Sequence, residues 1–139
     1  VEIHIEARVY KSQTPDRQNR FFLTIDSTRL VTIPGRSVSI QYKAVNVLIK
    51  AVFTLYQDVS NDWYLVIQGH VWVSSESDGV KYYSSIKSIP IQMGEVILFY
   101  PLGISEDSGE DEYNIELVIQ VVPSDTVQNG SNHQNEGIW

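Results

Sequence analysis

Apolar and polar residues alternate along most of this chain with a period of two. Near the start, the odd-numbered residues from Val1 to Val9 are apolar, and the residues between them are polar or charged. A similar alternation returns close to the end, over residues 115–122. Successive side chains of a strand point to opposite faces, so the pattern predicts strands with one face in a core.

Turn residues divide the rest of the chain into further short segments of the same kind. Pro34-Gly35 and Asp78-Gly79 are strong turn signals, and Asp26-Ser27 also predicts a turn. Pro90 restricts its segment to an edge strand or to the first residues of a strand. The predicted strands cover residues 1–11, 21–25, 30–33, 37–42, 63–73, 80–84, 86–92, 95–100 and 115–122.

Two places in this pattern allow more than one interpretation. Residues 46–56 alternate like a strand, but they also carry apolar residues at helical spacing. Their β-branched and aromatic content, and the lack of a helix cap, favour a strand. Gly69 interrupts the long strand at 63–73, which indicates either a bulge or a close approach of another segment to the backbone.

About nine or ten short strands at this spacing predict an all-β fold, a single antiparallel β-sandwich of Ig-like or jelly-roll-like type. With 139 residues in total, we expect one sandwich domain over residues 1–123. Residues 124–139 are rich in Asn, Gln, Ser and Gly and almost free of apolar residues. They predict a flexible polar tail.

Composition narrows the classes of function. The chain has no cysteine, which excludes disulfides, thiolate metal sites and a thiol nucleophile. Its net charge of −7 argues against a nucleic-acid partner. No apolar run reaches the roughly 18–20 residues of a transmembrane helix. The chain begins with Val1 instead of Met, which removal of a leader and shortening of the chain would explain equally well. We favour an exported, periplasmic or extracellular protein, and a cytoplasmic one stays open.

One acidic segment is the only weak candidate for a metal site. Five of the residues at 106–112 are carboxylates around Gly109, and Ca²⁺ prefers such oxygen ligands. Their spacing does not match the EF-hand loop, so an exposed acidic hairpin tip or a contact with a basic partner are the alternatives. We therefore predict no metal and no cofactor; the weak candidates are Glu106, Asp107, Glu110 and Asp111, followed by Glu112.

No arrangement of residues in the sequence predicts catalysis. The three histidines, His4, His70 and His133, lack the spacing of converging metal ligands. There is no Gly-x-Ser-x-Gly motif and no Gly-rich loop that leads into a helix. The sequence therefore predicts a protein that is not an enzyme.

Aromatic residues offer the best candidate for a binding surface. Tyr64, His70 and Trp72 share one face of the predicted strand at 63–73, and Tyr82 lies on a neighbouring segment. An exposed aromatic strip of this kind binds proteins or sugars, whereas the alternative is that the rings fill the core between two sheets.

The function expected from these observations is a non-catalytic interaction or assembly module. It would bind a protein partner through a strand edge, whose backbone groups are unpaired, or through a sheet face. The alternative is a carbohydrate-binding β-sandwich that uses surface Tyr and Trp residues. The oligomeric state stays open.

Overall fold

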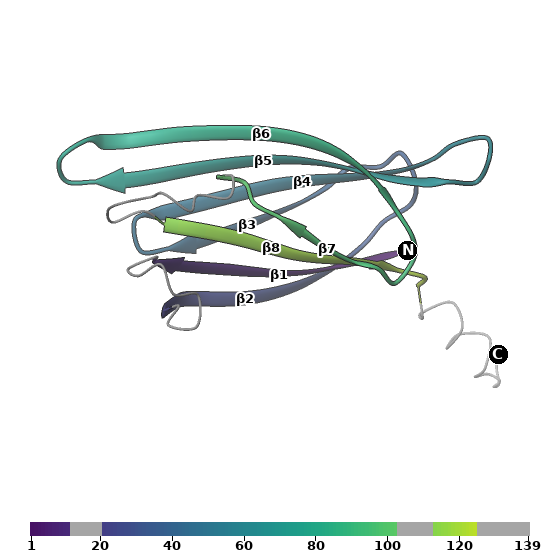
Figure 1. Cartoon of the computed structure of the whole chain (residues 1–139), viewed down its shortest axis with the longest axis horizontal. Helices are drawn as coiled ribbons and strands as arrows, with labels where there is room; N and C mark the ends of the chain where they lie inside the picture. The colour runs from purple at the N-terminus through teal and green to yellow at the C-terminus, as the bar shows by residue number, and fades with distance from the viewer. Residues whose placement is uncertain (12–20, 103–112, 125–139) are drawn as a thin grey trace, which may run out of the picture.

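The structure, a computed structural model, describes residues 1–11, 21–102 and 113–124 (Figure 1). This part of the chain forms strands, turns and irregular connections, without a helix. The eight strands are β1 (Glu2–Lys11), β2 (Phe21–Val31), β3 (Val38–Ala44), β4 (Val47–Gln57), β5 (Trp63–Ser75), β6 (Gly79–Ile91), β7 (Val96–Phe99) and β8 (Tyr113–Val122).

The strands form two four-stranded antiparallel sheets. Sheet A has the order β2-β1-β8-β7, so the first and last strands pair at its centre. Sheet B has the order β3-β4-β5-β6 and is a simple meander. Figure 1 shows the two sheets on opposite sides of the molecule, joined by the β2–β3 and β6–β7 connections. The prediction of an all-β antiparallel sandwich is confirmed.

The core lies between the sheets and is built from the alternate residues that the sequence pattern marked. On β1, the odd-numbered residues Ile3 to Val9 are buried, and on β8 so are the odd-numbered residues Ile115 to Val121. Sheet B contributes inward-facing residues from β4 and β5, with Phe53 the largest fully buried side chain. Burial of these apolar faces is the main term that stabilises the fold.

The strands are longer and fewer than the sequence predicted. Asp26 and Ser27 do not form a turn: they pair with Ala7 and Glu6 inside the continuous strand β2. Both side chains are exposed, so their polarity is compatible with a strand that pairs with β1, in a register that shifts only between Val9 and Tyr10. The predicted strands at 80–84 and 86–92 likewise merge into β6. Residues 47–57 form strand β4, as favoured over a helix.

Gly69 marks a close approach between the sheets and does not form a bulge. The register of β5 is regular on both sides of it. A Cβ atom at this position would lie 3.1 Å from the Phe99 ring and 3.3 Å from Cβ of Pro101. The end of β7 and the segment after it therefore pack closely against the backbone of β5, and a larger residue at position 69 would require Phe99 and Pro101 to move by a few tenths of an ångström.

The ends of the strands agree with the predicted turn chemistry. Gly35 and Gly79 have positive φ angles of 86° and 71°, as expected for the two predicted turns. Pro90 lies in β6, an edge strand of sheet B, as the sequence required. The acidic segment at 106–112 and residues 125–139 of the predicted tail lie outside the described residues. In the part that is described, there is no helix of the length and apolarity that crossing a membrane requires.

Candidate functional site

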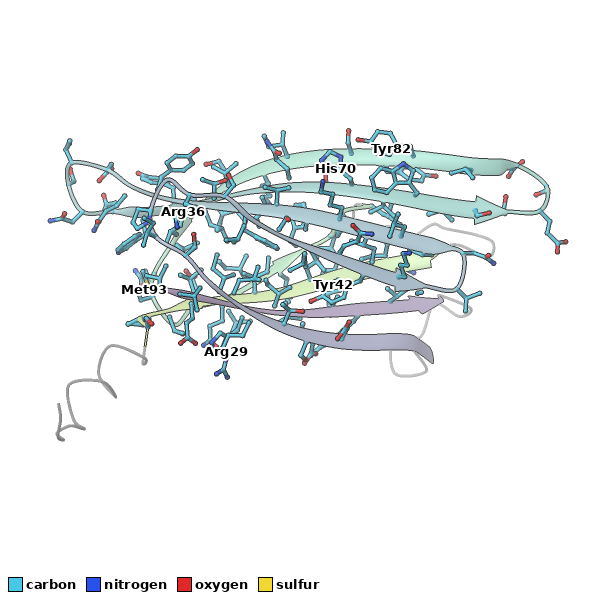
Figure 2. All side chains as sticks on the ribbon, turned by 180° about the vertical axis from the view of Figure 1, so that it is seen from behind. Arg29, Arg36, Tyr42, His70, Tyr82 and Met93 are labelled. Carbon is cyan, nitrogen blue, oxygen red and sulfur yellow. The ribbon has the colours of Figure 1, made fainter. Side chains whose placement is uncertain are left out.

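Three of the four predicted aromatic-site residues come together on the outer face of sheet B. Trp72 of β5 pairs with Tyr82 of β6, and His70 lies one place further along the same face of β5. Their ring centroids are 5.1 Å apart for Trp72 and Tyr82, 5.9 Å for His70 and Tyr82, and 6.1 Å for His70 and Trp72. Figure 2 shows His70 and Tyr82 next to each other over β5 and β6. We call these three residues the aromatic cluster.

The aromatic cluster is held in a defined arrangement. The ring planes of His70 and Tyr82 are inclined by only 14°, and those of His70 and Trp72 by 23°. A hydrogen bond of 2.6 Å joins Nδ1 of His70 and the Tyr82 hydroxyl across the two strands. Tyr82 remains 52% exposed. The rings therefore form a surface, and the alternative in which they fill the core does not hold for this cluster.

Tyr64 lies on the same face but apart from the aromatic cluster. It precedes His70 by six residues on β5, which is about 20 Å along an extended strand. Its neighbours across the sheet are Tyr56 and Pro90. The negative charge of Asp58 is the main cause that raises the pKa of the Tyr64 hydroxyl. Carboxylates therefore surround Tyr64 at this end of sheet B, whereas lysines lie beside the aromatic cluster.

Sheet B is basic on both faces, which the sequence interpretation missed: Lys43 and Lys50 lie on its outer face, and Lys81 and Lys87 lie on the face directed toward sheet A. Its four strands contain four lysines, Lys43, Lys50, Lys81 and Lys87, and no Asp or Glu. Lys50 lies opposite His70 on the neighbouring strand. Lys43 and Trp72 line a shallow cavity of about 240 Å³ beside the cluster. The signal was present in the sequence, because residues 38–57 and 79–91 hold no acidic residue, but the net charge of −7 concealed it.

Strand β6 forms the border of sheet B. It is 13 residues long, and none of the described strands pairs with its outer side (Figure 1). Most of its side chains are exposed on both faces of the sheet. Four of these are large and apolar or aromatic: Val80 is 66% exposed, Tyr82 52%, Tyr83 42% and Ile86 68%.

The hydrogen-bond pattern of sheet B shows which backbone groups of β6 have no partner among the described strands. The N–H of Ser74 donates to the carbonyl of Asn46 at 2.8 Å, so the even-numbered residues of β5 bond to the β4 side. In an antiparallel sheet, neighbouring residues of a strand bond to opposite sides, so the odd-numbered residues of β5 bond to β6. Each of these pairs with an odd-numbered residue of β6, such as Tyr83 with Val71.

The even-numbered residues of β6 therefore direct their N–H and C=O groups to the outer edge. Pro90 agrees with this assignment, because its position is even and its nitrogen has no hydrogen to donate. The edge thus offers five complete donor and acceptor sets, from Val80, Tyr82, Ser84, Ile86 and Ser88.

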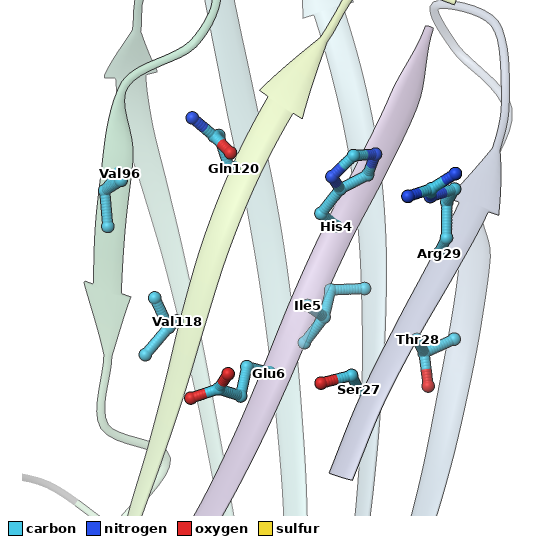
Figure 3. A pocket seen from close by; sticks show the side chains of 9 residues that line it. All are labelled: His4, Ile5, Glu6, Ser27, Thr28, Arg29, Val96, Val118 and Gln120. Atoms are coloured by element: carbon cyan, nitrogen blue, oxygen red, sulfur yellow. The ribbon is translucent and has the colours of Figure 1, made fainter.

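The outer face of sheet A holds a second hollow, a groove of about 380 Å³ (Figure 3). Its charged side chains already have partners. Nε2 of His4 lies 2.9 Å from Oε1 of Glu2, and Nε of Arg29 lies 3.6 Å from the same oxygen. The groove is lined by His4, Ile5, Glu6, Ser27, Thr28, Arg29, Val96, Val118 and Gln120.

A buried carboxylate lies on the same face of sheet A. Glu116 is only 4% exposed, and it accepts hydrogen bonds from Nη1 of Arg8 at 3.2 Å and from the Tyr100 hydroxyl at 3.0 Å. Arg8 also donates to Glu6, and this hydrogen bond is the main reason why the pKa of Arg8 is raised. Through Glu116, this network therefore links β1 and β8 to Tyr100, the residue that follows β7.

The described residues offer no arrangement for metal binding. No group of three or more His, Asp or Glu side chains within them could hold a metal ion. The weak candidates Glu106, Asp107, Glu110 and Asp111 lie outside the described part of the chain. His4 and His70, which the structure describes, bond to Glu2 and Tyr82 respectively.

Comparisons with known proteins found no counterpart: no protein-family model, no curated protein and no solved structure matches this chain.

Proposed function

We propose that this protein is a non-catalytic interaction module that binds a protein partner by strand addition along the outer edge of β6. In this mode, an extended segment of the partner becomes the fifth strand of sheet B. The observation that carries the proposal is the edge itself, which offers five consecutive outward-directed backbone sets next to exposed Tyr82 and Ile86.

The physical basis is that an uncovered edge is a template for another strand. Main-chain hydrogen bonds provide affinity, and the alternate side chains provide specificity. Proteins usually protect such edges with charges, proline, bulges or short strands. On β6, Lys81 and Lys87 flank the central run at 82–86, which is uncharged and regularly paired with β5. Pro90 lies near one end and leaves the centre of the edge open.

The other edges are less suitable. Strand β7 is only four residues long. Strand β2 carries exposed Asp26 and Arg29 only three residues apart within the strand, where charges discourage pairing, whereas the lysines of β6 lie on either side of the uncharged run at 82–86. Strand β3 has seven residues, and the hydroxyl of its Tyr42 donates to Thr28 of β2 at 2.7 Å, which ties this strand to sheet A.

The test blocks the edge without altering the ladder inside sheet B. Ser84→Pro removes an outward-directed N–H of β6. Ser39→Pro is the matched control on β3. The N–H of Gly35 donates to the carbonyl of Leu55, so the odd-numbered residues of β4 bond to the even-numbered residues of β3. The backbone N–H of Ser39, an odd-numbered residue, is therefore also directed to the outer edge of its strand. Both serines are exposed. Circular dichroism and thermal melting establish that both variants fold.

Binders selected from a displayed library of extended peptides provide the probe. We expect Ser84→Pro to abolish binding and Ser39→Pro to preserve it. Hydrogen exchange should show new protection of the amides of Val80, Tyr82, Ser84, Ile86 and Ser88 in the complex. Peptides that bind equally to both variants, or a library that yields no binder, would contradict the proposal.

The aromatic cluster supports a second candidate function, the binding of a carbohydrate. Aromatic surfaces contact the apolar faces of sugar rings, and Lys43 and Lys50 beside the cluster favour sugars that carry carboxylate or sulfate groups. A glycan array tests this candidate. Trp72→Ala should then abolish retention of acidic glycans while Ser84→Pro leaves it intact. An array without a hit would exclude this function.

A further inference from the structure

Resting on the proposed function, we infer the chemistry of the partner strand: its side chains are apolar on one face and acidic on the other. The acidic residues lie opposite Lys81 and Lys87, and the apolar residues lie beside Tyr82 and Ile86. The partner is therefore an extended peptide with alternating apolar and acidic character.

The side chains on each face of β6 determine which side chains fit on the same face of a strand paired with it. Side chains of directly opposite residues lie on the same face of the sheet and interact. On β6, the even-numbered residues share the outer face with Trp72 and His70, and the odd-numbered residues lie on the face directed toward sheet A. Each face of the added strand therefore meets one set of β6 side chains.

The face with the odd-numbered residues selects negative charge. Lys87 forms no ion pair with any described residue, whereas Lys81 lies 3.6 Å from Asp78. Both members of that pair are more than half exposed, so their attraction is weak. The two lysines are six residues apart, and the side chains between them on this face, Tyr83 and Ser85, are uncharged. Two carboxylates at the same separation would match them.

The face with the even-numbered residues selects apolar side chains. Ile86 is 68% exposed and Tyr82 52%, and each would be covered by a side chain from the added strand. Tyr82 is already fixed by its hydrogen bond to His70 and its contact with Trp72. Since this ring is ordered before binding, a partner does not need to immobilise it.

The same charges disfavour a second copy of this chain as the occupant. Two β6 strands paired about Ser84 would place Lys81 of each copy opposite Lys87 of the other. Like charges directly opposite each other destabilise a sheet. The joined sheets would also contain eight lysines and no acidic residue, twice the content of one sheet B. An acidic strand is the complementary partner.

The experiment uses three synthetic decapeptides with blocked ends. In each peptide, every second residue is Val or Ile, and the residues between them are Ser. Two of the Ser positions, six residues apart, are replaced. These two positions are Asp in the first peptide, Asn in the second and Lys in the third. Fluorescence anisotropy measures binding to the whole protein. We expect the Asp peptide to bind at least tenfold more tightly than the Asn peptide, and the Lys peptide to bind most weakly.

Charge reversal on β6 tests the same inference from the protein side. Lys87→Glu should weaken the Asp peptide and strengthen the Lys peptide. Lys43→Glu, an exposed lysine on the opposite edge of sheet B, should leave the order of the three peptides unchanged. Ile86→Asp adds a negative charge at the β6 edge without altering the backbone. Because Ile86 lies on the face that meets the apolar side chains, this variant should weaken all three peptides, and it tests the edge even if Ser84→Pro fails to fold.

The outcomes separate the chemistry of the partner from the proposed function. Equal affinities for the Asp and Asn peptides, lost in Ser84→Pro, would overturn the acidic partner and leave strand addition standing. Binding of none of the three peptides, together with a library that yields no binder, would overturn both. Self-association in sedimentation experiments that Ile86→Asp abolishes would replace the acidic partner by a second copy of the chain.

Discussion

The outer faces of the two sheets are built alike but carry their charges differently. On sheet A, His4 lies against Glu2, and Arg8 bonds to both Glu6 and Glu116. On sheet B, Lys43 and Lys50 are exposed and form no ion pair with any described residue. The charges of sheet A are thus used within the fold, whereas those of sheet B remain available to a partner.

Burial explains this difference. Glu2 and Glu116 of sheet A are only 6% and 4% exposed, and a carboxylate withdrawn from water requires partners that replace its hydration. The lysines of sheet B keep their hydration and need no partner. The buried, paired carboxylates of sheet A therefore contribute to stability. The exposed lysines beside the aromatic cluster are the charges that a partner could contact.

A substitution in the shared core should have the largest effect and should act on both sheets. Phe53→Ala removes a fully buried side chain of β4. We expect the free energy of unfolding to fall by about 3–5 kcal/mol, because the cavity adds to the lost burial. Chemical denaturation monitored by Trp fluorescence and far-UV circular dichroism should still give one transition. Two separate transitions would mean that the sheets fold independently.

The comparison of the outer faces is tested by one substitution on each. Glu116→Ala on sheet A removes the acceptor for Arg8 and Tyr100, and should cost about 1–3 kcal/mol in urea denaturation. Lys50→Ala on sheet B is the matched control, also on an outer face, and should change stability by less than about 0.5 kcal/mol. Equal losses would show that the charges of sheet B also serve the fold.

The contact between the sheets at Tyr42 should contribute less to the free energy of unfolding than Glu116 does. Its hydroxyl donates to Oγ1 of Thr28 at 2.7 Å, so Tyr42→Phe should cost about 1 kcal/mol. Burial is the main cause that raises the pKa of the Tyr42 hydroxyl above its ordinary value of 10.0.

As the pH rises, Tyr42 therefore loses its hydroxyl proton in the unfolded chain before it does so in the folded protein. The stability that this hydroxyl contributes is fully present below pH 10.0 and is lost as the pH rises further. Alkaline denaturation curves of Tyr42→Phe should decline less steeply than those of the wild type.

The period of two predicted the fold because each strand buries one face. It predicted the inward residues of β1 and β8 and the role of Pro90 in an edge strand. It failed at Asp26, because a polar residue exposed on a paired strand is indistinguishable in sequence from a turn residue. Only the register with β1 distinguishes them.

The candidate site was predicted only in part. The pattern placed His70 and Trp72 on one face, since they are two residues apart on a strand. It could not show that Tyr82 joins them, because this depends on the β5–β6 register. The distance of Tyr64 from His70, six residues along one predicted strand, was readable from the sequence and was overlooked. The basic character of sheet B was readable from the sequence, because residues 38–57 and 79–91 hold no Asp or Glu, but the net charge of −7 concealed it.

The smallest effect on stability is expected for Tyr82→Phe, which makes the same chemical change as Tyr42→Phe on an exposed surface. The hydroxyl of Tyr82 bonds to His70 at 2.6 Å, but the ring is 52% exposed. Water replaces the lost partner at little cost, so the free energy of unfolding should change by less than about 0.5 kcal/mol. The ring itself remains against Trp72, and the Trp fluorescence of the native state should be retained.

Denaturation of Tyr42→Phe and Tyr82→Phe under identical conditions makes the comparison direct. A larger loss for Tyr82→Phe than for Tyr42→Phe would mean that the aromatic cluster is needed to hold β5 and β6 together, and the argument that this face is available for binding would then fail.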